Sequence, residues 1–163
     1  RDLFSRVIHG AKLTLRIGLI AVGISLSSGL LIGLVAGYAG RWLERILMRL
    51  VDVLFSFTEI VIALACLAIL GMGLTNSMVA IGIASIPFYA RITHSVVLVE
   101  RGKPYFEAGI SAGCGHSRMI FLHLLPNVLP TLIVVGTLGI STAVLAAAGL
   151  SFLGLGAQPP EPE

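Results

Sequence analysis

The fold is decided by a stretch of 24 residues, IGLIAVGISLSSGLLIGLVAGYAG from Ile17 to Gly40, which contains no Asp, Glu, Lys, Arg or His. At about 1.5 Å of rise per residue, a helix of this length crosses the hydrocarbon core of a bilayer with some tilt. Small residues recur in it at every fourth position and therefore share one stripe of the helix: Ser25, Gly29, Gly33 and Gly37. We expect this stripe to be a packing seam, because small side chains let a neighbouring helix backbone approach closely.

The composition of the whole chain is that of a membrane protein. Of its 163 residues, 56% are hydrophobic and only 12% are charged, about half the charged fraction of a typical soluble domain, and the mean hydropathy is +1.00. The 11 basic and 8 acidic side chains form no basic run, which argues against a nucleic-acid-binding domain, a secreted disulfide scaffold or a disordered tail. Cys66 and Cys114 are expected to be small apolar groups rather than a disulfide or metal ligands.

Three more apolar segments follow the first span. We expect a second span from about Ile46 to Leu70, a third from about Asn76 to Leu98 and a fourth from Pro126 to about Gly149. The glycines of Gly71-Met72-Gly73 favour a tight hairpin between the second and third spans. The predicted fold class is therefore all-α, a polytopic transmembrane helical bundle of about four spans.

The basic residues predict the orientation of the bundle. They gather in two connectors, residues 38–50 and 99–123, which the positive-inside rule places in the cytoplasm. Basic residues before the first span favour the opposite orientation: Arg1, Arg6, Lys12 and Arg16. A preceding helix would remove this conflict, and we expect the chain to be a fragment.

The least apolar segment lies between the third and fourth spans, at residues 99–125. Pro104 suits the first turn of a helix, and Ser117 is a candidate cap for a second one, so we expect two short helices joined by a glycine bend. Ala108 and Gly109 leave part of this surface nearly bare of side chains. Such a surface suits close docking into a groove of another protein.

This segment resembles the EAA loop of bacterial ABC-importer permeases, whose pattern is Glu-Ala-Ala, then a glycine, then Ile-x-Leu-Pro. The matching residues are Glu107, Ala108, Gly109, Gly113, Leu125 and Pro126. Two residues depart from the pattern. Gly109 replaces the usual Ala, which lowers helix propensity by about 1 kcal/mol, and Leu124 replaces Ile.

Further motifs extend the resemblance over essentially the whole chain and toward the dipeptide, oligopeptide and nickel branch of the family. They are Asp2–Arg6 with Gly10-Ala11, Asp52–Phe57, Tyr89–Arg91, and Leu150–Gly156 with Gln158–Pro160. Thr58 stands where this branch often has proline, which predicts a weaker helix break there. Permeases of this branch usually have six spans, so the chain resembles the core of a six-span type I ABC importer permease, without one helix at each end.

The resemblance implies a permease subunit of the bacterial inner membrane that is not itself an enzyme. It would dock through the EAA loop (99–125) on separate ABC ATPase subunits, pair with a second homologous permease chain, and receive peptides or nickel from an extracytoplasmic substrate-binding protein. The sequence agrees on one point, because it has no GxxxxGK[ST] phosphate loop: Gly102-Lys103 is followed by Pro104. No cofactor, metal or nucleic-acid partner is expected.

Four polar residues lie within or at the ends of the predicted spans, where an uncompensated charge costs several kcal/mol: Asp52, Glu59, Arg91 and His94. Snorkelling to the interface accounts for Arg91 and His94. Asp52 lies at the membrane interface, pairs with Arg49 or lines the translocation path. Glu59 either lines that path or pairs with a helix outside this chain.

The competing hypothesis is an ion-coupled secondary transporter that uses Asp52, Glu59 and His94 as a proton relay. An intramembrane hydrolase is disfavoured, because the sequence has neither a nucleophile-elbow nor an HExxH pattern. The remaining histidines have no carboxylate or cysteine at ligand spacing, so metal binding is not expected.

Overall fold

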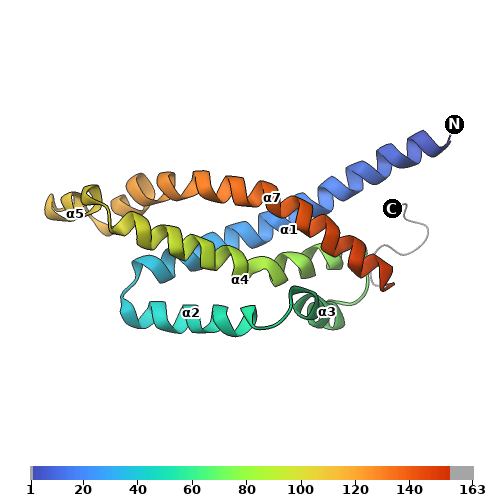
Figure 1. Ribbon diagram of the computed structural model, residues 1–163, viewed down its shortest axis with the longest axis horizontal. Coiled ribbons are helices and arrows are strands. Elements are labelled where there is room, and N and C mark those ends of the chain that lie inside the picture. The colour runs from blue at the N-terminus through green and yellow to red at the C-terminus, as the bar shows by residue number, and fades with distance from the viewer. Residues whose placement is uncertain (1, 155–163) are drawn as a thin grey trace.

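The computed structural model describes residues 2–154, which form a helical bundle (Figure 1). Its elements are α1 (Asp2–Tyr38), α2 (Arg41–Phe55), α3 (Glu59–Leu70), α4 (Leu74–Arg101), α5 (Pro104–Ser111), α6 (His116–Arg118), the π-helix η1 (Met119–Leu124) and α7 (Leu125–Phe152). The all-α prediction is confirmed. The motif residues Leu155, Gly156 and Gln158–Pro160 lie outside the described residues.

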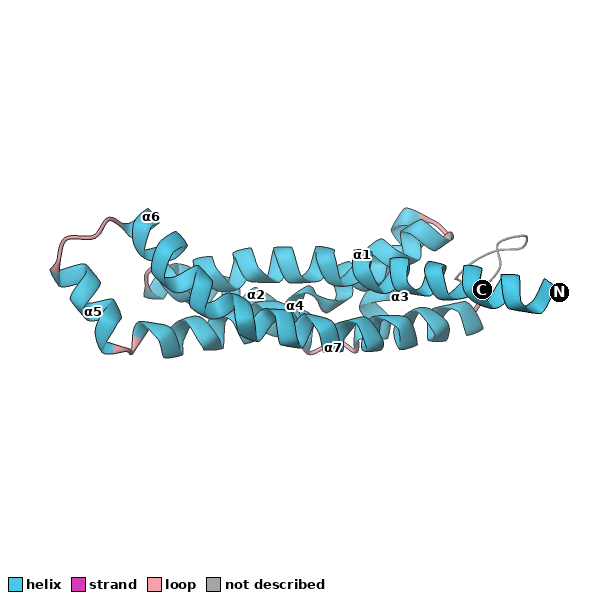
Figure 2. Ribbon diagram, turned by 90° about the horizontal axis from the view of Figure 1, so that it is seen from above, coloured by secondary structure: helices cyan, strands magenta, loops and turns pink. Residues whose placement is uncertain are grey.

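Three helical segments of the described chain are long and apolar enough to cross a membrane: Val7–Tyr38, Leu74–Arg101 and His116–Phe152. Helices α1 and α7 both pack against α4, and the three run side by side along the length of the bundle (Figures 1 and 2). The number of spans is four if the bent pair α2 and α3 is counted as one.

The weak helix break predicted at Thr58, within the second span, was wrong. Helices α2 and α3 meet at an angle of 92°, and the break lies at residues 56–58, between Phe55 and Glu59. Thr58 has an extended backbone (φ −64°, ψ 137°), so the helix ends here without the proline common in this branch. The Ser56 hydroxyl donates to the Val53 carbonyl oxygen at 2.6 Å, a side-chain bond that competes with continued helix.

Two other predicted boundaries were also wrong. Helix α1 begins at Asp2, well before Ile17, and its 37 residues extend about 55 Å. The fourth span begins at His116, because α6, η1 and α7 are continuous. The π-helical turn lies immediately before Pro126, whose ring would clash with the carbonyl four residues earlier in a regular α-helix.

The glycine stripe of α1 lies directly against α4. A Cβ atom at Gly29 would lie 2.8 Å from the Ala90 backbone nitrogen, and one at Gly33 would lie 2.7 Å from the Ala90 carbonyl oxygen. A Cβ at Gly37 would lie 2.9 Å from the Val97 Cβ. The two helices therefore approach so closely that even an alanine methyl does not fit between them.

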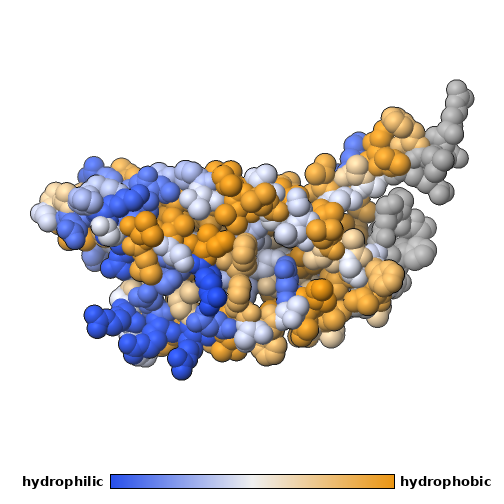
Figure 3. All heavy atoms as spheres, in the orientation of Figure 1, coloured by the Kyte–Doolittle hydropathy of each residue, from blue (hydrophilic) through white to orange (hydrophobic). Residues whose placement is uncertain are grey.

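The two basic connectors lie at the same end of the bundle, where α1 passes into α2 and where α5 and α6 project (Figure 1). The turn between α3 and α4 lies toward the other end, at the same end as the N-terminus, and Gly71 and Gly73 there adopt φ of +86° and +149°. Hydrophilic residues gather over the first end, and apolar residues cover most of the rest of the visible face (Figure 3). This arrangement agrees with the predicted orientation.

Candidate functional site

The predicted loop is a short helix set apart from the bundle by glycine-containing turns. Helix α5 begins at Pro104 and ends at Ser111, with Glu107 in its first turn. Gly113 then adopts φ +76°, a left-handed conformation that glycine takes without steric cost. The chain reverses there, and α5 projects beyond the long helices (Figure 2).

The second short helix of the prediction is not a separate element. The chain re-enters helix at His116, with Gly115 as the N-terminal flanking residue, so Ser117 lies inside the helix and does not cap it. This segment continues through η1 into α7. A displacement of the loop would therefore act directly on a membrane-spanning helix.

One face of the loop is bare and the other is anchored. Glu107, Ala108 and Gly113 are exposed, and a Cβ at Gly113 would meet no atom of this chain within 4 Å. On the opposite side, Phe106 and Met119 are buried in an apolar cluster with residues of α1, α4 and α7. The loop therefore has one exposed face, while Phe106 and Met119 hold it in the core. Leu125 and Pro126, the remaining residues of the motif, begin α7.

The unusual glycine in the motif has a packing reason. A Cβ atom at Gly109 would lie 2.7 Å from the sulfur of Met119, a side chain that is fully buried. Methionine fills irregular gaps in apolar cores. The Met119 side chain therefore occupies the space that the methyl group of the more usual alanine would need at position 109.

A buried carboxylate ties the loop to two long helices. Glu100, at the end of α4, is 6% exposed; Lys103 donates to its Oε1 at 2.5 Å and the Tyr105 hydroxyl to its Oε2 at 2.7 Å. Asn127 of α7 donates in turn to the Tyr105 hydroxyl oxygen at 3.3 Å. Burial and then the Glu100 hydrogen bond raise the pKa of the Tyr105 phenol, which therefore remains a donor at neutral pH.

Helix α1 makes a second attachment. The Tyr38 hydroxyl lies 3.0 Å from His116 Nδ1, and its ring packs edge-on against Phe106. Arg101 donates to the Gly37 carbonyl oxygen at 2.5 Å, which satisfies an acceptor at the C-terminal end of α1. The loop is therefore attached to α1, α4 and α7 together.

We expect Tyr105→Phe to loosen the attachment of the loop to α4 and α7. A hydrogen bond to a charged group contributes about 1.5–3 kcal/mol, and the variant removes only this bond and its link to Asn127. In the detergent-solubilised full-length protein, hydrogen exchange of the α5 backbone amides should become several-fold faster. Ser117→Ala is the matched control, because it removes a hydroxyl from the same segment; an unchanged exchange rate in Tyr105→Phe would contradict the attachment role.

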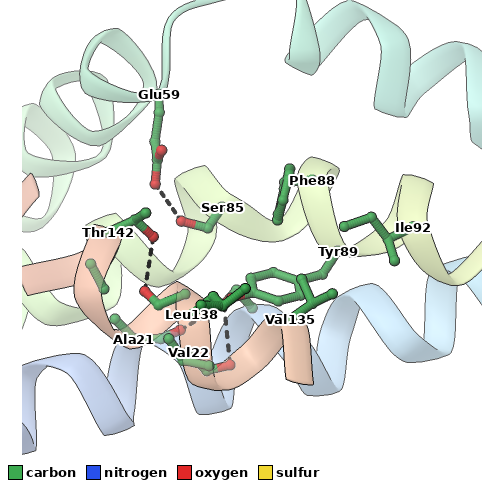
Figure 4. A pocket seen from close by; sticks show the side chains of 13 residues that line it. Ala21, Val22, Glu59, Ser85, Phe88, Tyr89, Ile92, Val135, Leu138 and Thr142 are labelled. Atoms are coloured by element: carbon green, nitrogen blue, oxygen red, sulfur yellow. Dashed lines mark hydrogen bonds between the residues drawn. The ribbon is translucent and has the colours of Figure 1, made fainter. Parts of the chain in front are cut away.

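A cavity of about 350 Å³ lies between α1, α3, α4 and α7. Its lining is mostly apolar, and Glu59 points into it from the first turn of α3 and accepts a hydrogen bond from Ser85 of α4 (Figure 4). Ser25, Tyr89 and Thr142 supply three more hydroxyl groups, and the Thr142 hydroxyl donates to the Gly139 carbonyl oxygen at 2.9 Å. Glu59 is the one charged residue in this lining.

The other three polar residues of the spans form side-chain pairs between α2 and α4. Arg91 pairs with Asp52 and lies over the Phe55 ring at 4.6 Å, and His94 Nε2 lies 2.9 Å from the Glu44 carboxylate. The pair of Asp52 with Arg49, one of the alternatives for Asp52, is not formed, and Arg91 and His94 both bind acids on α2. The sequence did not single out Glu44 or Ser85, since their partners lie on other helices.

The proposed proton relay is not assembled within the described chain. Asp52 and His94 line a groove between α2 and α4, whereas Glu59 lines the separate cavity. Among residues 2–154, no group of three or more His, Cys, Asp or Glu side chains is placed to hold a metal. Cys66 and Cys114 are free thiols.

The fold and the loop define a class of protein, a multi-span helical membrane protein with a short helix that projects at one end. Residues 29–163 match the family described as the binding-protein-dependent transport system inner membrane component, and the chain belongs to that family. The resemblance to ABC-importer permeases and the location in the bacterial inner membrane are thereby confirmed.

Curated relatives match the chain over its whole length. The di/tripeptide transport system permease protein DppC of Pseudomonas aeruginosa (strain UCBPP-PA14) is 48% identical over all of this chain and 54% of that protein. Over the same shares, the dipeptide permease DppC of Alkalihalophilus pseudofirmus is 44% identical and the glutathione permease GsiD of Pectobacterium atrosepticum is 42% identical. The chain thus spans about half the length of the curated relatives it matches.

A solved structure supports the fold independently. The inward-facing MetNI methionine ABC transporter superposes with a TM-score of 0.83 at 22% identity, covering 96% of this chain and 78% of that chain. A second crystal form of the same transporter gives 0.82 at 23% identity. The all-α fold of this chain is therefore shared with a chain of that transporter.

Proposed function

We propose that this chain is the membrane-spanning core of a permease subunit in an ATP-driven importer of short peptides. The observation that carries the proposal is the loop at residues 99–125. One of its faces is exposed, and its buried side chains attach it to α1, α4 and α7. A push on α5 would move these three helices together, because Phe106 and Met119 are buried among them. Such a loop is suited to convert the closure of a separate ATPase into movement of the membrane helices.

The partners follow from this arrangement. ABC ATPase subunits would bind the face formed by Glu107, Ala108 and Gly113. A second homologous permease chain would complete the translocation path, and an extracytoplasmic substrate-binding protein would deliver the cargo at the opposite end. ATP would be bound in the ATPase subunits, since the permease sequence has no phosphate-binding loop.

Short peptides are the cargo best supported by the relatives, which are named for dipeptides, di/tripeptides and glutathione. Within the path we assign a role to Glu59, because its carboxylate faces a cavity without a basic side chain in its lining. A carboxylate in such surroundings favours a cationic group, and a peptide carries one at its free amino terminus.

Reconstitution tests the function directly. The full-length permease, its partner permease, the ATPase subunits and the binding protein are placed in proteoliposomes, and uptake of labelled dipeptide and tripeptide is measured. We expect uptake only with ATP. Uptake driven by a proton gradient without ATPase subunits would overturn the proposal in favour of a secondary transporter. ATP-driven uptake of nickel without uptake of peptide would contradict the assignment of short peptides as the cargo.

Glu59→Gln provides the test of the translocation path in the same assay. Glutamine is nearly isosteric and still accepts a hydrogen bond from Ser85, so the variant removes the charge alone. We expect peptide uptake to fall about tenfold, equivalent to 1.4 kcal/mol, while basal ATP hydrolysis continues. Uptake at the unmodified level would show that the carboxylate does not contact the cargo.

A further inference from the structure

A basic groove lies between α2 and α4, at the end of the bundle that carries the two basic connectors. Its volume is about 590 Å³, and four arginines line it: Arg41, Arg45, Arg49 and Arg91. Its acids are Glu44 and Asp52, with His94 beside them. The cluster lies outside both the docking loop and the cavity at Glu59.

Both acidic side chains of the groove already bind another side chain, whereas three of its arginine side chains do not. Asp52 binds Arg91, and Glu44 binds His94. Arg41, Arg45 and Arg49 are exposed, and no hydrogen bond or ion pair to their guanidinium groups is found among residues 2–154. Their four-residue spacing puts the three guanidinium groups in a row of about 12 Å along one face of α2. This row is a site of uncompensated positive charge.

An apolar face borders the arginine row. Trp42, Leu50 and Val53 are 73%, 59% and 54% exposed, and they lie on the side of α2 next to the arginines, turned away from buried Val51. Tryptophan is typical of the boundary between headgroups and hydrocarbon. A ligand that fits both surfaces has an anionic head and apolar tails.

We propose that this groove binds the phosphate headgroup of an anionic phospholipid of the cytoplasmic leaflet, with the acyl chains against Trp42, Leu50 and Val53. Guanidinium groups bind phosphate oxygens through paired hydrogen bonds. Clusters of basic residues on amphipathic helices and in pockets between membrane helices attract anionic lipids. A free phosphate would use the same arginines and leave the apolar face unused, so the continuity of the two surfaces favours the lipid.

Native mass spectrometry of the purified full-length permease complex tests the site. The complex is supplied with phosphatidylglycerol, with phosphatidylethanolamine or with inorganic phosphate, and bound ligand is counted. We expect retention of phosphatidylglycerol at least tenfold above phosphatidylethanolamine. Equal retention of the two lipids by the unmodified complex, or binding of phosphate as strong as that of phosphatidylglycerol, would overturn the proposal without any variant.

Charge removal locates the binding. Each basic residue near an anionic surface contributes about 1 kcal/mol, so Arg45→Gln should weaken retention of phosphatidylglycerol about fivefold, and the double variant with Arg49→Gln about 30-fold. Arg118→Gln is the matched control, because it removes the same charge from an exposed site on the other basic connector. Equal losses in Arg45→Gln and Arg118→Gln would show diffuse attraction to the membrane instead of a site in this groove.

Discussion

Replacing Gly113 with asparagine is expected to reduce both substrate-stimulated ATP hydrolysis and peptide uptake by roughly 5-fold to 150-fold, with the permease still folded in the membrane. Asparagine adopts the left-handed region more readily than other residues with a side chain, so the turn at φ +76° should persist. The added side chain meets nothing within this chain, since even its Cβ has open space. Any clash must therefore come from a docked partner.

The size of the effect follows from packing at the interface. A side chain forced into a closely packed contact costs about 1–3 kcal/mol, which weakens association roughly 5-fold to 150-fold. The measurements are ATP hydrolysis and uptake in the reconstituted transporter, together with recovery of the ATPase subunits on the purified permease. All three should fall in parallel.

Gly115→Asn is the control for this experiment. Gly115 is also exposed and open to an added Cβ, but its φ of −64° is ordinary and it lies outside the EAA pattern. We expect its uptake to remain close to that of the unmodified protein. Normal uptake in Gly113→Asn would contradict the docking role, and Gly113→Val would then reveal whether only the backbone conformation matters, because a β-branched residue is strained at positive φ.

The sequence predicts the parts of this structure that depend on local pattern. Small residues at every fourth position of α1 form a stripe whatever the rest of the chain does, and that stripe lies against α4. Pro104 and the positive φ of Gly113 bound the short helix α5 where the motif places it. Each of these features needs only the geometry of a single helix or turn.

The features that sequence reasoning missed depend on the register between distant segments. The pairs Arg91–Asp52 and His94–Glu44 join residues 39 and 50 positions apart, and their partners are fixed only when α2 is laid against α4. The attachment of Tyr105 to Asn127 is of the same kind. One contact of this attachment is local: Glu100 and Lys103 are three residues apart, so their spacing in the sequence favours a pair within one turn.

The sequence at the bend between α2 and α3 predicts a weak helix break, whereas the two helices meet at 92°. Thr58 replaces a proline, which suggested a weaker break, but Ser56 and Thr58 can end a helix through their own hydrogen bonds and backbone preferences. The bend matters for the site, because Glu59 is the first residue after it. If α2 and α3 formed one straight helix, the Glu59 carboxylate would point in another direction and would not face Ser85 of α4.

Gly33→Ala is expected to destabilise the bundle strongly for a change of a single methyl group. The new Cβ would clash with Thr93 and lie 2.7 Å from the Ala90 carbonyl oxygen. The latter is a backbone atom that cannot rotate away, so α1 and α4 must separate. Overpacking of this kind costs about 1–3 kcal/mol, which lowers the melting temperature of a chain of this size by roughly 2–12 °C. Thermal aggregation of the detergent-solubilised full-length permease measures the shift.

Gly23→Ala in the same helix separates close packing from helix propensity. Gly23 is exposed and a Cβ there meets nothing within 4 Å, so the methyl group costs no packing and gains up to about 1 kcal/mol of helix propensity. Its melting temperature should equal or exceed that of the unmodified permease while that of Gly33→Ala falls. Because both variants add the same methyl to the same helix, a difference between them can arise only from what each position faces. Equal melting temperatures would mean that α1 and α4 do not approach as closely as the glycine stripe requires.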